Sequence, residues 1–275
     1  MKRPISRHLL DIAIDRLADK FGDPIRIRRM MANVIIGQLL PDGVCVKGGS
    51  ALKFRYGDAA TRFTRDLDIA RSEDLSICIR NIGNALQQGW NGFNGIVVPG
   101  RKANPVGVPD QYVMEPYAAK LTYNNKPWMT VELEIGHNEI GDADMFDEAI
   151  PKQMQDIFEE LGFPRPRPVR IMTLSHQIAQ KLHAVTTPGG KRAHDLLDLQ
   201  LMIGQSTPDY PDLKRICQRL FAYRKMQAWP PILSAGEDWA ERYDTQKEGL
   251  PVLPTVGEAV IWANDLIQRI ANTSD

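Results

Sequence analysis

The stretch that decides the fold reads VKGGSALKFRYGDAATRFTRDLDIA and covers residues 46–70. It opens with a short β-rich run that ends at Gly48-Gly49-Ser50, and a short helix is expected over residues 50–56. Two glycines let the backbone approach a ligand closely. The N–H groups at a helix N-terminus, together with the Ser50 hydroxyl, suit a phosphate. A purely structural turn would use the same residues, so both interpretations stay open at this point.

Two acids stand near the end of this stretch, in Asp66-Leu67-Asp68-Ile69. In a strand, residues two apart point to the same face, so the two carboxylates are expected side by side with Leu67 and Ile69 buried behind them. Two like charges this close repel unless a cation lies between them, and a hard divalent cation such as Mg²⁺ is the usual solution. A solvent-facing edge strand with two acids is the structural alternative.

A third acid is expected from a neighbouring strand if two metal ions bind about 3.5–4 Å apart. Residues 111–135 predict two antiparallel strands joined by a tight turn at Asn124-Asn125. The second of these strands contains Glu132 and Glu134, which alternate with apolar residues and therefore share a face. The residues alone do not choose between these two glutamates, and a half-exposed strand with a polar face would look the same.

The rest of the chain is mostly helical. Three prolines within residues 164–168 exclude regular structure there and mark a predicted domain boundary, with residues 1–163 before it and 164–275 after it. The expected fold class is α/β (α+β) with an all-helical C-terminal half. Helices are predicted at residues 5–20, 24–39, 74–88, 152–161, 174–186, 193–204, 210–225, 236–246 and 255–271.

Composition excludes several classes of protein. The chain has 275 residues with 34 Lys+Arg against 34 Asp+Glu, so it cannot coat nucleic acid through bulk positive charge. It contains no apolar run of the roughly 18 residues that a membrane span needs, and its first residues do not resemble a signal peptide. The three cysteines are scattered, which favours a reducing compartment. A cytoplasmic protein without membrane contact is therefore expected.

The combined motifs resemble the DNA polymerase beta-like nucleotidyltransferases, and among them the AbiEii/AbiGii toxin family, which includes the MenT toxins. Residues 47–52 match its Lys-Gly-Gly-Ser-Ala-Leu block, and residues 62–68 match Arg-Phe-Ser-x-Asp-hydrophobic-Asp, with Thr64 in place of Ser. Two further blocks match at residues 179–184 and 192–199, where His194 replaces a common Lys. The resemblance spans about residues 44–200.

The resemblance implies a polymerase beta-like core with a mixed sheet and a site for two Mg²⁺ ions. The metal ligands carried over are Asp66, Asp68 and Glu134, with Glu132 as the alternative. Glu134 is preferred because the family's acid usually stands just before the last hydrophobic residue of this strand.

Residues of the C-terminal half are expected to complete the nucleotide site. Lys181 is a compact charge suited to a triphosphate, and we expect it to be solvated in the free enzyme. Asp195 and Asp198 share a helix face; one would bind nucleotide or orient Lys181 while the other pairs with Arg192. The nucleotide-binding set carried over is Gly48, Gly49, Ser50, Lys181, Arg192, Asp195 and Asp198, with Lys181 also assigned to catalysis. Without the family, an exposed lysine and an ordinary acid cluster near a helix start would explain the same residues.

The function implied is that of a Mg²⁺-dependent nucleotidyltransferase toxin of a toxin–antitoxin or phage-defence pair. It would bind an NTP across the cleft between the halves, transfer NMP to an acceptor hydroxyl and release pyrophosphate. The 3′ end of tRNA is the leading acceptor because some family members act there, and a cognate antitoxin is the expected partner. The alternatives are transfer to a protein side chain or small molecule, and a catalytically silent binding module or antitoxin.

Overall fold

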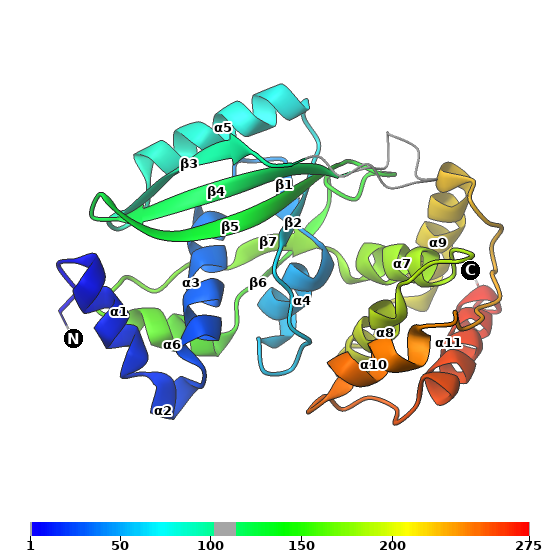
Figure 1. The fold of residues 1–275 in the computed structure, drawn as a ribbon. Helices are drawn as coiled ribbons and strands as arrows, with labels where there is room; N and C mark the ends of the chain where they lie inside the picture. Colours follow the sequence, from blue (N-terminus) through cyan, green and yellow to red (C-terminus); the bar gives the residue numbers. More distant parts are fainter. Residues whose placement is uncertain (1, 102–113, 275) are drawn as a thin grey trace. The chain divides into compact units, whose positions relative to one another are not determined.

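The computed structural model describes residues 2–101 and 114–274, which form two compact units (Figure 1). The first unit contains Met1–Asp58 and Thr64–Met172. The second contains Thr173–Asp275 and also the short segment Ala59–Phe63. The chain therefore enters the second unit briefly, just before the predicted acids, and returns to it after Met172.

A seven-stranded mixed sheet forms the centre of the first unit, with strand order β3-β4-β5-β2-β1-β7-β6. The β2–β5 and β1–β7 pairs are parallel and the remaining pairs are antiparallel, as expected for the mixed sheet. The strands are β1 (Val44–Val46), β2 (Leu67–Arg71), β3 (Phe93–Pro99), β4 (Glu115–Tyr123), β5 (Lys126–His137), β6 (Phe146–Ala149) and β7 (Val169–Met172).

Helices of the first unit pack their apolar sides into one core with the sheet. They are α1 (Arg7–Asp15), α2 (Ala18–Phe21), α3 (Pro24–Leu39), α4 (Gly48–Tyr56), α5 (Leu75–Gln88) and α6 (Lys152–Glu160). The start of α3 follows from its sequence: the Asp23 side chain accepts a hydrogen bond from the Ile25 N–H, and Pro24 occupies the first turn. The single helix predicted at residues 5–20 is wrong, because α1 ends at Asp15 and a separate short helix follows.

Strands β4 and β5 form the predicted hairpin. Asn124 and Asn125 both have positive φ, 46° and 62°, which is the backbone of a type I′ turn. One face of the pair is buried in the core through Ala119, Leu121, Tyr123, Val131, Leu133 and Ile135. The alternate residues lie on the opposite, accessible face. Residues 111–113, which the sequence assigned to the first strand, lie outside the described residues.

The second unit is helical, as predicted. It contains α7 (Leu174–Val185), α8 (Ala193–Gln205), α9 (Tyr210–Arg224), α10 (Trp239–Lys247) and α11 (Val256–Ala271). Among the residues that the structure describes, no helix combines the length and the hydropathy that crossing a bilayer requires.

The proline-rich segment belongs to the first unit. Val169–Met172 continues from it as β7, which pairs with both β1 and β6. The division between the compact units at Met172 therefore lies beyond the predicted boundary between residues 163 and 164.

Candidate functional site

Four carboxylates gather on the accessible face of the neighbouring strands β2 and β5. In the parallel register Asp68 lies beside Glu134, and Leu67 beside Leu133. Asp66 immediately precedes β2, and its side chain shares a hydrogen bond with Glu132. The apolar residues between these acids are buried, as the alternating pattern predicted. The structure thus brings together Asp66, Asp68 and both candidate glutamates.

The pKa of Asp66 is raised to about 6. Burial is the largest cause, followed by the hydrogen bond shared with Glu132 and the negative charge of Asp68. Arg29 acts in the opposite direction but does not compensate. These carboxylates therefore form a negatively charged site in which a cation would be stabilised.

Only glycine fits at residue 48, because Asp68 lies directly against its backbone. The φ of Gly48 is +61°, and a Cβ atom placed on it would lie 1.9 Å from Asp68 Oδ2. The Lys47 N–H donates to the Asp68 carbonyl over 2.8 Å, which fixes this approach of backbone to carboxylate. Any side chain at residue 48 would displace Asp68, so the Gly48-Gly49 turn positions an acid.

Ser50 has a different role from the one predicted for its hydroxyl. The residue is fully buried, and its Oγ donates to the Asp66 carbonyl over 2.7 Å. This bond ties the first turn of α4 to the residue that starts the acid pair. The hydroxyl is therefore engaged within the protein, and a phosphate at this turn would meet the backbone N–H groups at the start of α4.

Lys47 is a residue that the sequence interpretation quoted but gave no role. A Cβ atom placed on Gly136 would lie 2.5 Å from Lys47 Nζ, so the lysine side chain lies over this glycine. Gly136 stands two residues beyond Glu134 on β5 and shares its face. A glycine inside a strand marks close approach by another group, and that signal could have identified Lys47.

The donor set fits a hard cation. Carboxylate oxygens are the ligands that Mg²⁺ prefers, and burial together with the neighbouring acids Asp68 and Glu132 raises the pKa of Asp66. In the described part of the chain, however, no three His, Cys, Asp or Glu side chains already converge into a metal site. Binding would require Asp66 to exchange its contact with Glu132 for a metal ion.

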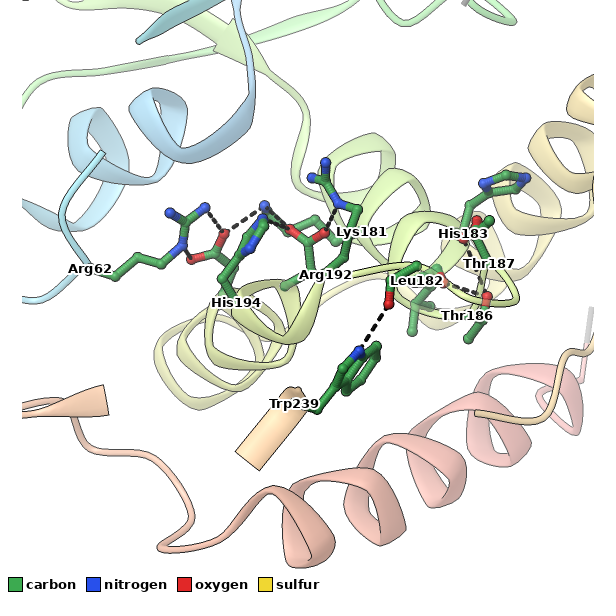
Figure 2. A network of polar contacts seen from close by, with 12 residues as sticks. Arg62, Lys181, Leu182, His183, Thr186, Thr187, Arg192, His194 and Trp239 are labelled. Atoms are coloured by element: carbon green, nitrogen blue, oxygen red, sulfur yellow. Dashed lines mark hydrogen bonds and ion pairs between the residues drawn. The ribbon is translucent and has the colours of Figure 1, made fainter. Parts of the chain in front are cut away.

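The second unit contains a charge cluster formed by Arg62, Lys181, Arg192, Asp195 and Asp198 (Figure 2). Lys181 Nζ lies 2.8 Å from Asp195 Oδ1 and 2.6 Å from Asp198 Oδ2. Arg62 binds Asp198 through two hydrogen bonds of 2.9 Å, and Arg192 Nε lies 2.5 Å from Asp195 Oδ2. Three cations thus hold two carboxylates, which leaves one surplus positive charge.

Burial makes the charge cluster strongly interdependent. Both aspartates are fully buried, and burial alone would raise their pKa values. The nearby cations outweigh that effect and hold both pKa values below their usual range. Lys181 and Arg192 act on Asp195, and Lys181 and Arg62 act on Asp198. Burial and the surrounding cations lower the pKa of the neighbouring His194 to about 4, against the pull of Asp195, so it is neutral at pH 7.

The loop from α7 to α8, which leads to Arg192, is fixed at two points. Thr186 Oγ1 donates to the Leu182 carbonyl over 2.7 Å, and Trp239 Nε1 donates to the Gly190 carbonyl over 2.9 Å (Figure 2). The Arg192 side chain is half-exposed, whereas Lys181 is only 7% exposed. Arg192 is therefore the more accessible of these two cations.

The family model described as "Nucleotidyl transferase AbiEii toxin, Type IV TA system" matches residues 29–264. The chain belongs to the AbiEii nucleotidyltransferase toxin family. It is accordingly a nucleotidyltransferase enzyme, and the resemblance read from the sequence is confirmed.

The solved structure of a nucleotidyltransferase toxin agrees with this chain at the level of the fold. MenT4, a nucleotidyltransferase toxin from Mycobacterium tuberculosis H37Rv, is 15% identical with a TM-score of 0.59, over 98% of this chain and 91% of that one. Two structures from Helicobacter pylori are each 17% identical over 90% of this chain. The first, a proposed nucleotidyltransferase, is matched over 94% of its own chain with a TM-score of 0.46. The second, JHP933, is matched over 91% of its own chain with a TM-score of 0.42. A comparison with curated protein sequences finds no significant match.

Within this AbiEii family member, two features of the charge cluster differ from the expectation. Lys181 is not solvated, because it is buried between Asp195 and Asp198. Arg62 belongs to the same cluster although it was quoted only as part of a motif. Its partner stands 136 residues later in the chain, so no local pattern could have revealed the pair.

Proposed function

We propose that this AbiEii family member transfers a nucleoside monophosphate from an NTP to the 3′ end of a tRNA in a Mg²⁺-dependent reaction. The observation that carries the proposal is the set of carboxylates on one accessible face of β2 and β5, with Asp68 held against the backbone of Gly48. Half-buried carboxylates that repel one another, such as Asp66 and Asp68, lower the stability of the folded protein, and binding of a catalytic metal ion would explain why they are placed together.

Asp66, Asp68 and Glu134 are the proposed ligands of two Mg²⁺ ions, with Glu132 as the alternative third acid. Once bound, Mg²⁺ would neutralise phosphate charge and favour in-line attack at the α-phosphorus. The bond from Ser50 to the Asp66 carbonyl and the contact of Gly48 with Asp68 hold the two aspartates in place before any ligand arrives. Such preorganisation lowers the cost of reaching the transition state.

The chain offers further positive charge and N–H groups to the triphosphate. In the first unit these are the N–H groups of Gly48, Gly49 and Ser50 and the ammonium group of Lys47. The contributions of Lys181, Arg192, Asp195 and Asp198 to nucleotide binding stay predictions. The exposure of Arg192 favours a direct contact there, whereas the burial of Lys181 favours a role in holding the two aspartates.

The family supports the proposal of a partner, and the acceptor is part of the proposal. A toxin of this kind implies a cognate antitoxin, and we propose a tRNA 3′ hydroxyl as the group that attacks the nucleotide. Transfer to a protein side chain or a small molecule is the alternative.

The test is incubation with labelled NTPs and either total RNA or total protein, with and without Mg²⁺. We expect labelled RNA of tRNA size that requires Mg²⁺, and no labelled product from Asp66→Asn or Asp68→Asn. The control is Asp156→Asn, which removes a half-exposed carboxylate that pairs with Lys152 on α6. Labelled protein in place of RNA would favour the alternative acceptor. Activity within tenfold of wild type in either site variant would overturn the metal assignment.

A further inference from the structure

A hollow lies along the β3–β4–β5 ribbon, and Arg7 of α1 and Gln87 of α5 also line it. The hollow has a volume of about 650 Å³ and lies within the first unit, over all three strands. This volume falls within the about 300–1,000 Å³ range of ligand pockets. Its lining includes Ile96 of β3, Lys120 and Thr122 of β4 and Thr130 of β5. The strand register places Ile96 opposite Lys120, and Lys120 opposite Thr130, so they form one row across the ribbon.

The lining has the charge and chemistry of a surface for an anionic chain. Among the described residues that line the hollow, Lys120 and Arg7 are cationic and none is acidic, although the whole chain is neutral. Lys120 is exposed, and the pair between Arg7 and Asp11 lies at the surface, where such pairs hold a cation weakly. Thr130 adds a hydroxyl to this lining, whereas the Asn94 amide and the Thr122 hydroxyl already donate to the carbonyls of Gln87 and Asn94.

One apolar residue in this row stands out. Ile96 is 50% exposed on the face of the ribbon, where it lies opposite the cationic Lys120. A cation next to an exposed apolar side chain suits a nucleotide, which has a charged phosphate and an apolar base face.

Thr130, which lines the hollow, lies on the same face of β5 as Glu132 and Glu134. Thr130, Glu132 and Glu134 are alternate residues of this strand, so their side chains point to one side. Thr130 at the edge of the hollow stands two residues from Glu132, about 6.7 Å along the strand. A chain lying in the hollow would therefore end beside the acids.

We propose that this hollow binds the single-stranded 3′ segment of the RNA acceptor, with Lys120 on a backbone phosphate and Ile96 against a base. The inference rests on the proposed function in one respect, namely that the acceptor is RNA. It assigns to β3, β4 and β5 a substrate-binding role that is separate from the metal and nucleotide groups.

The experiment measures binding without catalysis. A short fluorescent single-stranded RNA with a free 3′ hydroxyl is titrated with wild-type protein, Lys120→Glu and Arg80→Glu, at several salt concentrations. Arg80 is the matched control, since it is an exposed cation of the same unit on α5. Arg80 does not line the hollow, although Gln87 near the C-terminal end of the same helix does.

Reversing the charge of a phosphate contact should weaken RNA binding by at least about tenfold. It should also reduce the slope of log Kd against log salt by about 1. Arg80→Glu should match wild type, and nucleotide affinity should be the same in all three proteins. RNA affinity and salt slope in Lys120→Glu equal to those of Arg80→Glu would overturn the proposal.

The proposed function can fail separately from this inference. Wild-type protein that binds the RNA through Lys120 but labels only proteins would contradict the RNA acceptor of the proposed function. The hollow would still be an RNA-binding site. Loss of protein labelling in Lys120→Glu, with RNA binding unchanged, would instead assign the hollow to a protein acceptor and overturn the inference.

Discussion

Replacing Lys181 by methionine removes the central cation of the charge cluster while keeping much of the side-chain volume. Lys181 is 7% exposed and touches two fully buried carboxylates at 2.8 and 2.6 Å. Removing one partner of a buried ion pair costs about 3–5 kcal/mol, because the remaining charge is buried without compensation. Here Arg62 still binds Asp198 and Arg192 still binds Asp195, so we expect the lower end, about 3 kcal/mol.

This loss is large enough to measure. For a chain of more than 150 residues each kcal/mol shifts the Tm by about 2–4 °C, so Lys181→Met should melt roughly 6–12 °C below wild type. Calorimetry at neutral pH measures the shift. Lys191→Met is the control, since this lysine is exposed and makes only a weak surface contact. Its Nζ lies 4.0 Å from Asp238 Oδ2. A Lys181→Met Tm within about 2 °C of wild type would refute the reasoning.

A nucleotide titration of the same variant addresses the predicted triphosphate contact. A charge-assisted contact of Lys181 to phosphate is worth about a tenfold to hundredfold change in affinity. The titration is done well below the Tm of the variant, so that lost folding does not imitate lost binding. Unchanged affinity beside a lowered Tm would assign Lys181 to the charge cluster alone.

Three other predictions concern single residues. Gly48→Ala should reduce turnover by at least tenfold while leaving the fold largely intact, because the new Cβ displaces the Asp68 carboxylate; turnover near wild type would show that this contact is dispensable. Glu134→Gln should lose most activity and Glu132→Gln much less, and the reverse ranking in the transfer assay would make Glu132 the third metal ligand. The folded pKa of His194 is about 4 against about 6.5 unfolded, so the unfolded chain binds more protons between these pH values. Stability should therefore fall by up to about 3 kcal/mol as pH drops from 6.5 to 4, and chemical denaturation of His194→Gln should show a flatter profile than wild type.

The elements best predicted from the sequence are those with strong local patterns. The β4–β5 hairpin follows from alternating residues around Asn124-Asn125, and α3 and α5 follow from an apolar stripe after Asp23 and Asp74. Strands β3, β6 and β7 were not predicted. Their stability comes from pairing with neighbours distant in sequence, and Phe146–Ala149 has no alternation of its own.

The acids of the candidate site were predictable for a similar reason. An acid that alternates with buried residues identifies its face, and the parallel register of β2 and β5 then places Asp68 beside Glu134. The alternation of acids with buried residues could not show which side-chain atoms form ion pairs and hydrogen bonds. The burial of Lys181 between two aspartates and the engagement of the Ser50 hydroxyl depend on packing that only the folded chain defines.

The early excursion of residues 59–63 into the helical unit has a consequence for how the protein is made. Arg62 leaves the ribosome 136 residues ahead of Asp198, the carboxylate that it binds. At about 5–20 residues per second of synthesis, that interval lasts roughly 7–27 seconds. Until that interval ends, the segment of residues 59–63 that leads into Asp66 lacks the contact between Arg62 and Asp198. A fragment truncated at Met172 would never form this contact. Protease cleavage within residues 59–63 of stalled nascent chains, lost once residue 198 has emerged, would reveal this waiting period.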